Sequence, residues 1–251
     1  MTQRSLVGPA TGRILGSFAR MSAPSPSEPR RLTAEAVLER GGTVLHVFRH
    51  GAVAAPWPGR VYGRLDVPLS EEGLDQAAWG ARSLEGLELR AVVSSGLPRA
   101  EETARLLRGS RGLPRQDRPE LLEIDRGAWA GLGPEEIEAQ TPGAFAAWQR
   151  SGGVLAPPGG ETLQVMAGRV VPALTELAEL NPGGRVAVAA HMWVVRIAVS
   201  MGLDRPLQRA AGIRVGTGAR CDLAWSRAEG FRLLGAVAPE GSALTVDGAL
   251  L

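Results

Sequence analysis

Two of the three histidines in this chain stand directly behind apolar runs that have the composition of buried strands. Arg49 and His50 follow the run TVLHVF, and His191 follows RVAVAA. A third run, RAVVSS, is followed four residues later by Arg99. Neutral imidazole is a nucleophile near pH 7, and the planar guanidinium group binds phosphate oxygens in pairs without losing its charge. These residue types predict phosphoryl transfer through a histidine, provided that the fold brings them together.

The elements that must position these side chains alternate between strands and helices. The runs at 43–48, 90–95 and 185–190 are typical of strands buried on both faces of a parallel sheet. Ligands of such sheets bind at the carboxyl ends of the strands, which is where the two arginines and two histidines fall. Alone, Arg99 would suggest a solvated residue at a helix start and His191 a core histidine, so their joint placement carries the prediction. We therefore expect an α/β fold, a three-layer α/β/α sandwich with a mostly parallel central sheet.

Helices are predicted between these strands from caps and from apolar spacing. Leu74, Ala77, Ala78 and Ala81 recur at helical spacing and predict a buried face. The first predicted helix begins after the N-cap Thr33 and ends before Gly41, and the second covers 71–84 with Ser70 as its N-cap. The third covers 98–108 and begins at Pro98. The fourth covers 161–180 with a kink at Pro172, and the fifth covers 192–202.

The composition excludes several classes of protein. All 28 basic residues are arginines, so no lysine is present for a Schiff base or a GxxxxGK[ST] phosphate loop. The arginines are interleaved with 26 acidic residues, and this scatter disfavours nucleic-acid binding. No apolar run is long enough to predict a membrane span. The single cysteine, Cys221, cannot form an internal disulfide, which favours a reducing compartment, and we expect a cytoplasmic protein.

The N-terminal segment, residues 1–32, is rich in Ser, Pro, Gly and Arg without a regular period. We expect it to be a disordered extension, with residues 33–251 forming a single domain. An organellar transit peptide and a true start at Met21 are both compatible with this segment.

Cys221 and Arg227 satisfy CxxxxxR, the pattern of cysteine-dependent phosphatases. The intervening DLAWS has no glycine and alternates like an edge strand, and it is followed by the turn RAEG and a second strand, FRLLGAV. A β-hairpin is therefore the favoured interpretation. His46 lies inside the first strand and is assigned no catalytic task.

Six motifs occur along the chain in the order found in one family: RHG, YGRLDVPLSEEG, VVSSGLPRAEETA, LLEIDRGAWAGL, PPGGET and VAVAAH. Over residues 43–200 the sequence resembles the histidine phosphatase superfamily, also called phosphoglycerate mutase-like, in its phosphatase branch. With the residue chemistry above, the resemblance implies that His50 forms a phosphohistidine. Arg49, Arg99 and a charged His191 are expected to bind the phosphoryl oxygens, without a metal ion or cofactor.

The resemblance also implies roles for residues that their chemistry alone does not single out. Glu123 corresponds to the acid of the family's LxE segment, which protonates the leaving group and then activates water. Tyr62 and Gly63 fall where substrate contacts of the family usually lie. The chain departs from the family pattern at Ala52 and Val53 after RHG, and at the bulky Met192 and Trp193 after His191.

The sequence therefore predicts a phosphomonoesterase whose partner is a small-molecule phosphate ester. A mutase-type phosphotransferase and a catalytically idle phospholigand-binding protein are the alternatives. Only 34 positions separate Glu123 from Pro157, which is short for a mutase insertion and favours hydrolysis. Residues 133–153 of this stretch are expected to form a helical lid. Apolar edge elements near the C-terminus leave a homodimer open.

Overall fold

The central sheet consists of five strands in the order β2-β3-β1-β5-β6. In this computed structural model, which describes residues 32–251, β1 pairs in parallel with β3, and β3 with β2. β5 and β6 add antiparallel to the other side of β1, so the sheet is mixed with a parallel half. The strands are β1 (Thr43–Arg49), β2 (Ala91–Ser94), β3 (Arg185–Ala190), β5 (Arg220–Ser226) and β6 (Gly230–Val237). The predictions for the N-terminal extension lie outside the described residues.

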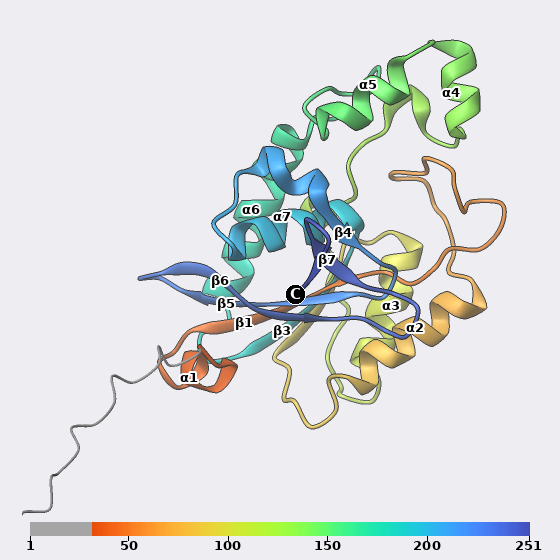
Figure 1. Ribbon diagram of the computed structural model, residues 1–251. Helices are drawn as coiled ribbons and strands as arrows, with labels where there is room; N and C mark the ends of the chain where they lie inside the picture. Colours follow the sequence, from red (N-terminus) through yellow and green to blue (C-terminus); the bar gives the residue numbers. More distant parts are fainter. Residues whose placement is uncertain (1–31) are drawn as a thin grey trace, which may run out of the picture. The chain divides into compact units, whose positions relative to one another are not determined.

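Helices cover both faces of the sheet, which confirms the three-layer α/β/α sandwich. Leu45 and Val47 point to one face and pack in the core cluster that contains α6 (Leu163–Glu179) and α7 (Met192–Gly202). Phe48 points to the other face, where α2 (Glu71–Arg82) and α3 (Pro98–Arg108) pack. Figure 1 shows α6 and α7 above the sheet and α1 (Ala34–Glu39) and α2 below it. This alternation along β1 is the pattern of a strand buried on both faces.

The helix after Ser70 was predicted correctly, but only part of its buried face was, because Ala77 is buried and Ala81 packs against the core whereas Leu74 is exposed. Ser70 Oγ caps α2 by accepting a hydrogen bond from the Gly73 N–H at 3.1 Å. Leu74 is 38% exposed, and the buried positions are Gly73, Gln76, Ala77 and Gly80. A Cβ atom on Gly73 would lie 2.0 Å from the Ala52 carbonyl oxygen, and one on Gly80 would lie 3.0 Å from the Phe48 ring. The helix therefore packs through its glycines, whose lack of a side chain permits a close approach that hydropathy does not register.

The predicted β-hairpin is confirmed as β5 and β6, although β5 is an interior strand rather than an edge, because β1 pairs with its other side. A second sheet, in the order β4-β7-β8, lies near the C-terminus. Its strands are β4 (Ile213–Val215), β7 (Leu244–Val246) and β8 (Ala249–Leu250).

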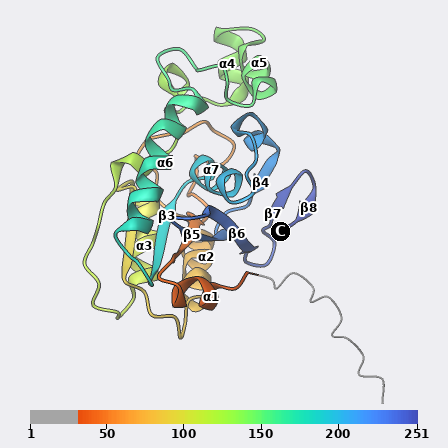
Figure 2. The same ribbon diagram turned by 90° about the vertical axis from the view of Figure 1, so that its left-hand side faces the viewer.

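Two helices occupy the segment in which a lid was predicted, α4 (Pro134–Gln140) and α5 (Ala144–Ser151). Figures 1 and 2 show them next to each other at one end of the unit, away from the central sheet. Leu32–Leu251 pack as one compact unit. No helix within this part of the chain is long and apolar enough to cross a membrane. Short 3₁₀ helices lie at Pro119–Leu121, Gly127–Trp129 and Leu207–Gly212.

Candidate active site

The carboxyl ends of β1, β2 and β3 bring the predicted histidines and Arg99 together. The His50 N–H donates to the Ala190 carbonyl oxygen at 3.0 Å, which places the end of β1 beside the start of α7. The His50 and His191 rings lie edge to face, with centroids 5.4 Å apart. His50, Arg99 and His191 are all buried, at 2%, 0% and 0% exposure. The parallel half of the sheet thus concentrates these groups at one edge, as the strand pattern predicts.

The hydrogen bonds of His50 fix which ring nitrogen can act as a nucleophile. Nδ1 lies 2.7 Å from the Gly51 carbonyl oxygen, which only accepts, so Nδ1 carries the proton. Nε2 then presents its lone pair, which accepts a hydrogen bond from Arg99 Nε at 3.2 Å. Burial, followed by the charges of Arg99 and Arg49, lowers the pKa of His50 well below its ordinary value. The ring is neutral at pH 7, as a nucleophile must be.

Arg99 is anchored at each nitrogen of its guanidinium group. Besides its bond to His50, Nη1 donates to the Leu65 carbonyl oxygen at 2.8 Å and Nη2 to the Gly63 carbonyl oxygen at 2.5 Å. The Tyr62 ring lies 5.0 Å from Cζ, in a cation–π arrangement. The cation is therefore held rigidly against the nucleophilic nitrogen.

His191 was expected to be charged when it binds phosphoryl oxygens, whereas the protein groups around it favour the neutral ring. Burial, followed by the charges of Arg99 and the His50 ring, lowers its pKa well below the ordinary value. Nε2 lies 2.7 Å from Ser95 Oγ, and Nδ1 is buried without a partner among residues 32–251. The charged form is disfavoured because a buried imidazolium would face a guanidinium group. A dianionic ligand at this place would reverse the sign of that interaction.

Arg49 connects this cluster to an open cavity. Nη1 donates to the Val215 carbonyl oxygen at 2.5 Å, while the buried Nε has no partner in the described chain. Arg49 and His50 both line a cavity of about 510 Å³. Arg99 and His191 contact His50 but do not line the cavity. A ligand in the cavity therefore meets His50 directly, whereas Arg99 and His191 lie next to the His50 ring and not in the cavity wall.

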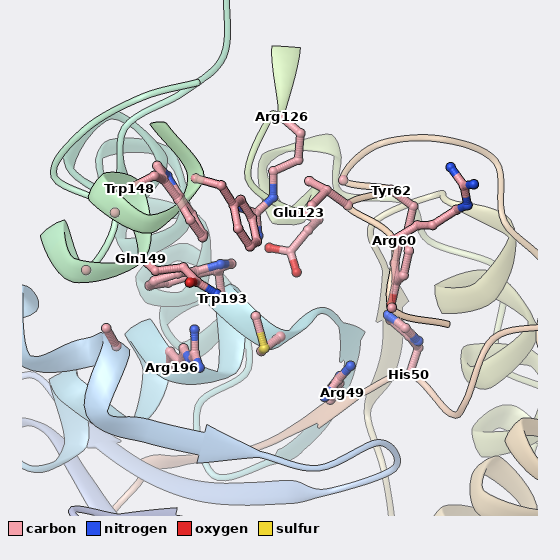
Figure 3. Close-up of a pocket in the computed structure, with 18 residues that line it drawn as sticks. Arg49, His50, Arg60, Tyr62, Glu123, Arg126, Trp148, Gln149, Trp193 and Arg196 are labelled. Atoms are coloured by element: carbon pink, nitrogen blue, oxygen red, sulfur yellow. The ribbon is translucent and has the colours of Figure 1, made fainter. Parts of the chain in front are cut away.

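Glu123 reaches the same cavity from the loop before the second 3₁₀ helix. Figure 3 shows its carboxylate pointing into the cavity, across from Arg49 and His50. Its backbone carbonyl accepts hydrogen bonds from Arg64 Nε at 3.1 Å and Arg169 Nη2 at 3.2 Å. Both arginines also bind Glu161, at 3.0 and 2.8 Å. Glu161 belongs to the PPGGET motif, which therefore holds the Glu123 loop in place.

Tyr62 and Gly63, the two residues for which substrate contacts are predicted, both line the cavity. Gly63 has φ +45°, and a Cβ atom there would lie 2.6 Å from Arg126 Cγ. The glycine therefore serves a backbone role, in which it presents its carbonyl to Arg99 and leaves room for Arg126.

Several lining residues were not predicted from the sequence. Arg126 stands three residues after Glu123, and Arg196 lies three residues after Trp193 on α7. Nothing in the chain distinguishes these two among 28 arginines, because only the folded loop and helix direct them inward. The bulky pair Met192 and Trp193 does line the cavity. The remaining unpredicted lining residues are Gly59, Arg60, Val61, Phe145, Trp148, Gln149, Gly152, Gly153 and Ala211.

Cys221 and Arg227 form no phosphate loop. Cys221 lies in the middle of the sheet on β5, where burial raises the pKa of its thiol and disfavours the thiolate. Arg227 is 87% exposed in the turn after that strand. His46 points to the other side of the sheet from the α6–α7 face, where its Nδ1 lies 2.7 Å from Asp222. Within residues 32–251, no cluster of three or more His, Cys, Asp or Glu side chains is placed to hold a metal ion.

Comparison with known proteins gives concordant results. A family model described as "Histidine phosphatase superfamily (branch 1)" matches residues 45–235. An adenosylcobalamin/alpha-ribazole phosphatase of Escherichia coli is 29% identical over 174 residues, covering 69% of this chain and 86% of that protein. A glucosyl-3-phosphoglycerate phosphatase of Mycobacterium tuberculosis is 38% identical over 138 residues, covering 55% and 61%. A solved structure of a mycobacterial glucosyl-3-phosphoglycerate phosphatase superposes with a TM-score of 0.69 at 30% identity, covering 76% and 96%.

Proposed function

The chain belongs to the histidine phosphatase superfamily, and from this membership we propose that it is a metal-independent phosphomonoesterase that works through a phosphohistidine on His50. The observation that carries the proposal is the state of the His50 ring. Its Nδ1 is bound to a carbonyl, its Nε2 lone pair is free of a proton, and its neighbours hold it neutral. A buried imidazole in that state, open to a cavity lined by cations, is prepared to attack phosphorus.

In the first half-reaction, His50 Nε2 bonds to phosphorus as the ester P–O bond breaks, and the electron pair of that bond leaves with the oxygen. The Gly51 carbonyl stabilises the positive charge that develops on the ring, because it accepts from Nδ1–H. Arg99 Nε transfers its hydrogen bond from His50 Nε2 to a phosphoryl oxygen, and Arg49 offers the unpartnered Nε. Such preorganised cations stabilise the charge of the transition state.

Glu123 supplies the proton that the departing alkoxide needs. In the second half-reaction the same carboxylate takes a proton from water, the water oxygen bonds to phosphorus, and the P–N bond breaks to return its electron pair to His50. The position of Glu123 across the cavity from His50 supports this role, because leaving group and incoming water occupy the side opposite the nucleophile (Figure 3).

Hydrolysis is favoured over the two alternatives. The relatives compared above are named phosphatases, and the stretch in which a lid is predicted contains only the short helices α4 and α5. The positions that depart from the family pattern remove none of the groups that act on phosphorus, which argues against an idle binding protein. The cavity volume of about 510 Å³ suits a small phosphorylated metabolite.

Turnover of para-nitrophenyl phosphate by the native chain and by His50→Ala tests the proposal. We expect His50→Ala to lose about a thousandfold or more in kcat, and the native chain to yield an acid-labile phosphohistidine after a rapid quench. The matched control is His46→Gln, which should keep its activity, since His46 does not line the cavity and its partner Asp222 also binds Arg220, at 3.0 Å. Equal rates for the native chain and His50→Ala at every pH, with no phosphohistidine, would refute the mechanism.

A further inference from the structure

The phosphate-binding groups occupy only one side of the cavity. In Figure 3, Arg196, Trp193 and Trp148 lie on the side away from His50 and Arg60, with Glu123 between the two sides. The chemistry proposed above uses none of these three residues. Together with Arg126, these residues are placed to bind a part of the substrate other than its phosphoryl group.

Arg126 is a buried cation that makes no ion pair, although the charge of Glu123 acts on it from a greater distance. It is 8% exposed, and no carboxylate of residues 32–251 lies within ion-pair distance of it. Its Nη1 is buried and has no hydrogen-bond partner in this part of the chain. Its Cζ lies 4.4 Å from the centre of the Trp148 ring. Stacking on an indole fixes the plane of the guanidinium but leaves its in-plane N–H groups free for an oxygen ligand.

Arg196 repeats this arrangement from α7. Its Cζ lies 4.4 Å from the centre of the Trp193 ring, and its Nε donates to the Ile213 carbonyl oxygen at 2.8 Å. Burial, opposed by the charge of Glu123, lowers the pKa of Arg196 to about 10, and the charges of Arg49 and Arg126 add to the shift. The group stays charged at pH 7. Two like charges that line one cavity without carboxylate partners favour a bound anion.

We propose that Arg126 and Arg196 form a second anion subsite that binds a carboxylate of the substrate, so that the enzyme acts on phosphate monoesters of carboxylic acids. This proposal rests on the phosphatase activity proposed above. It adds that the portion of the substrate that does not react carries a carboxylate.

The charge of the site favours a second anionic group on the substrate. Four arginines line the cavity or contact His50 and have no carboxylate of the described residues within ion-pair distance: Arg49, Arg99, Arg126 and Arg196. Glu123 holds its proton when it acts as the acid, so at that step it cancels none of these charges. A phosphate monoester brings about two negative charges, and a carboxylate on the same substrate adds a third. The planar carboxylate fits the in-plane N–H groups of a guanidinium that is stacked on an indole.

The aromatic rings of this subsite already pack against protein side chains. Arg126 covers one face of Trp148, and Phe145 stacks on the same indole at 18° with centroids 6.1 Å apart. Trp193 carries Arg196 and meets Trp148 edge to face at 6.2 Å. These contacts engage the faces on which a nucleobase would stack, so an acidic substrate fits the subsite better than a nucleotide.

Three matched esters test the proposal: 3-phosphoglycerate, glycerol 3-phosphate and propane-1,3-diol bisphosphate. The first two differ only in a carboxylate against a neutral hydroxymethyl group. We expect the native chain to prefer 3-phosphoglycerate over glycerol 3-phosphate by about 10- to 100-fold in kcat/KM, the range for a hydrogen-bonded charged group. Arg126→Gln should reduce this ratio at least tenfold. A preference for the bisphosphate over 3-phosphoglycerate would overturn the assignment to a carboxylate.

The matched control is Arg150→Gln, which removes an exposed arginine of α5 that does not line the cavity. It should preserve the ratio of the native chain. A native ratio within twofold of one, or an equal change of the ratio in the two variants, would overturn the subsite. Failure of the phosphatase proposal looks different, because no ester, para-nitrophenyl phosphate included, would then show turnover that depends on His50.

A second measurement on the native chain covers the case in which Arg126→Gln does not fold. Glycerate and glycerol are compared as competitive inhibitors of para-nitrophenyl phosphate turnover. We expect glycerate to inhibit at a concentration about tenfold or more below that of glycerol, because the product retains the carboxylate. Equal inhibition by the two compounds would contradict the proposal.

Discussion

Arg99 Nε donates a hydrogen bond of 3.2 Å to His50 Nε2, the nitrogen whose lone pair would attack phosphorus. The same guanidinium group is fixed by two backbone carbonyls, and the histidine by a third. The cation therefore keeps the nucleophile unprotonated while no substrate is bound and is in place for the phosphoryl group when one arrives. One guanidinium group can do both because it only donates hydrogen bonds. It therefore binds the lone pair of Nε2 in the free enzyme and an oxygen of the phosphoryl group when substrate is bound.

Arg99→Lys should lower kcat/KM for para-nitrophenyl phosphate by about 100- to 1000-fold, although it keeps the positive charge. An ammonium group cannot hold the carbonyls of Gly63 and Leu65 and still point at His50 Nε2. Steady-state kinetics with a thermal melt measures this. Activity within threefold of the native chain would show that the charge alone matters and that the fork geometry does not.

The lowered pKa values of the two active-site histidines predict an acid-sensitive fold. The ordinary pKa of histidine is 6.5, so below that pH both histidines bind a proton in the unfolded chain, whereas buried His50 and His191 stay neutral in the folded chain. The free energy of unfolding therefore falls as the pH falls. Each histidine should remove about 1 kcal/mol between pH 6.5 and 5.5. Urea unfolding of the native chain and of His191→Gln at these two pH values measures the effect. The variant should lose about 1 kcal/mol less over this interval, and an equal loss in both would contradict the shift assigned to His191.

The positions of the catalytic groups were predictable from the sequence, but their electrostatic state was not. Arg49, His50 and His191 follow apolar runs, and the rule that ligands bind at the ends of parallel strands needs only the order of elements along the chain. The charge of His191 depends on its burial and on its distance from Arg99, and both of these follow from three-dimensional packing. The sequence therefore predicts the charge that His191 needs beside a phosphoryl group, but not the neutral ring that the surrounding protein groups favour.

The distal wall of the cavity shows a similar limit. Arg126 and Trp148 are 22 positions apart in the sequence and meet only because α5 folds back over the loop after Glu123. Hydropathy also placed the exposed Leu74 in the buried face of α2 and missed Gly73 and Gly80, which make its closest contacts. Contacts of these kinds have no signature in spacing or composition.

Gly63→Ala should reduce activity through Arg126. The added Cβ atom would lie 2.6 Å from Arg126 Cγ, and φ +45° adds a backbone cost of about 1 kcal/mol. Gly86→Ala is the matched control, because it has φ +75° and nothing within 4 Å of the added atom. Both variants should lose stability, measured by urea unfolding, but only Gly63→Ala should lose kcat/KM for 3-phosphoglycerate. Equal kinetics in the two variants would show that Arg126 tolerates the displacement.

Cys221→Ala should retain the turnover of the native chain within about twofold. The thiol is buried in the sheet, and its raised pKa keeps it protonated, so it is neither a nucleophile nor a target for alkylation. Iodoacetamide should leave the folded native chain unmodified by mass spectrometry and modify it in urea. Rapid alkylation of the folded chain that abolishes activity would instead support a cysteine mechanism.

Glu161→Gln should affect both stability and catalysis, although Glu161 does not line the cavity. Its carboxylate binds Arg64 and Arg169, the two arginines that hold the Glu123 carbonyl. Burial opposes the charge of Glu161, but Arg169, the Asp125 N–H and Arg64 hold its pKa below the ordinary value. Its stabilisation is therefore present above pH 4.5, the ordinary value, and is lost as the pH falls through the lowered pKa.

The neutral amide leaves the partly buried Arg169 without a counter-ion and Arg64 with Asp125 alone, at 3.2 Å, and we expect a loss of about 2–3 kcal/mol in the free energy of unfolding at pH 7. The displaced Glu123 should lower kcat for a poor leaving group such as glycerol 3-phosphate more than for para-nitrophenyl phosphate, which needs less help from an acid. Glu176→Gln removes the same charge from an exposed pair with Arg118 and should change stability by no more than about 0.5 kcal/mol. A uniform loss of kcat on both esters would show that Glu161 supports the fold without positioning the acid.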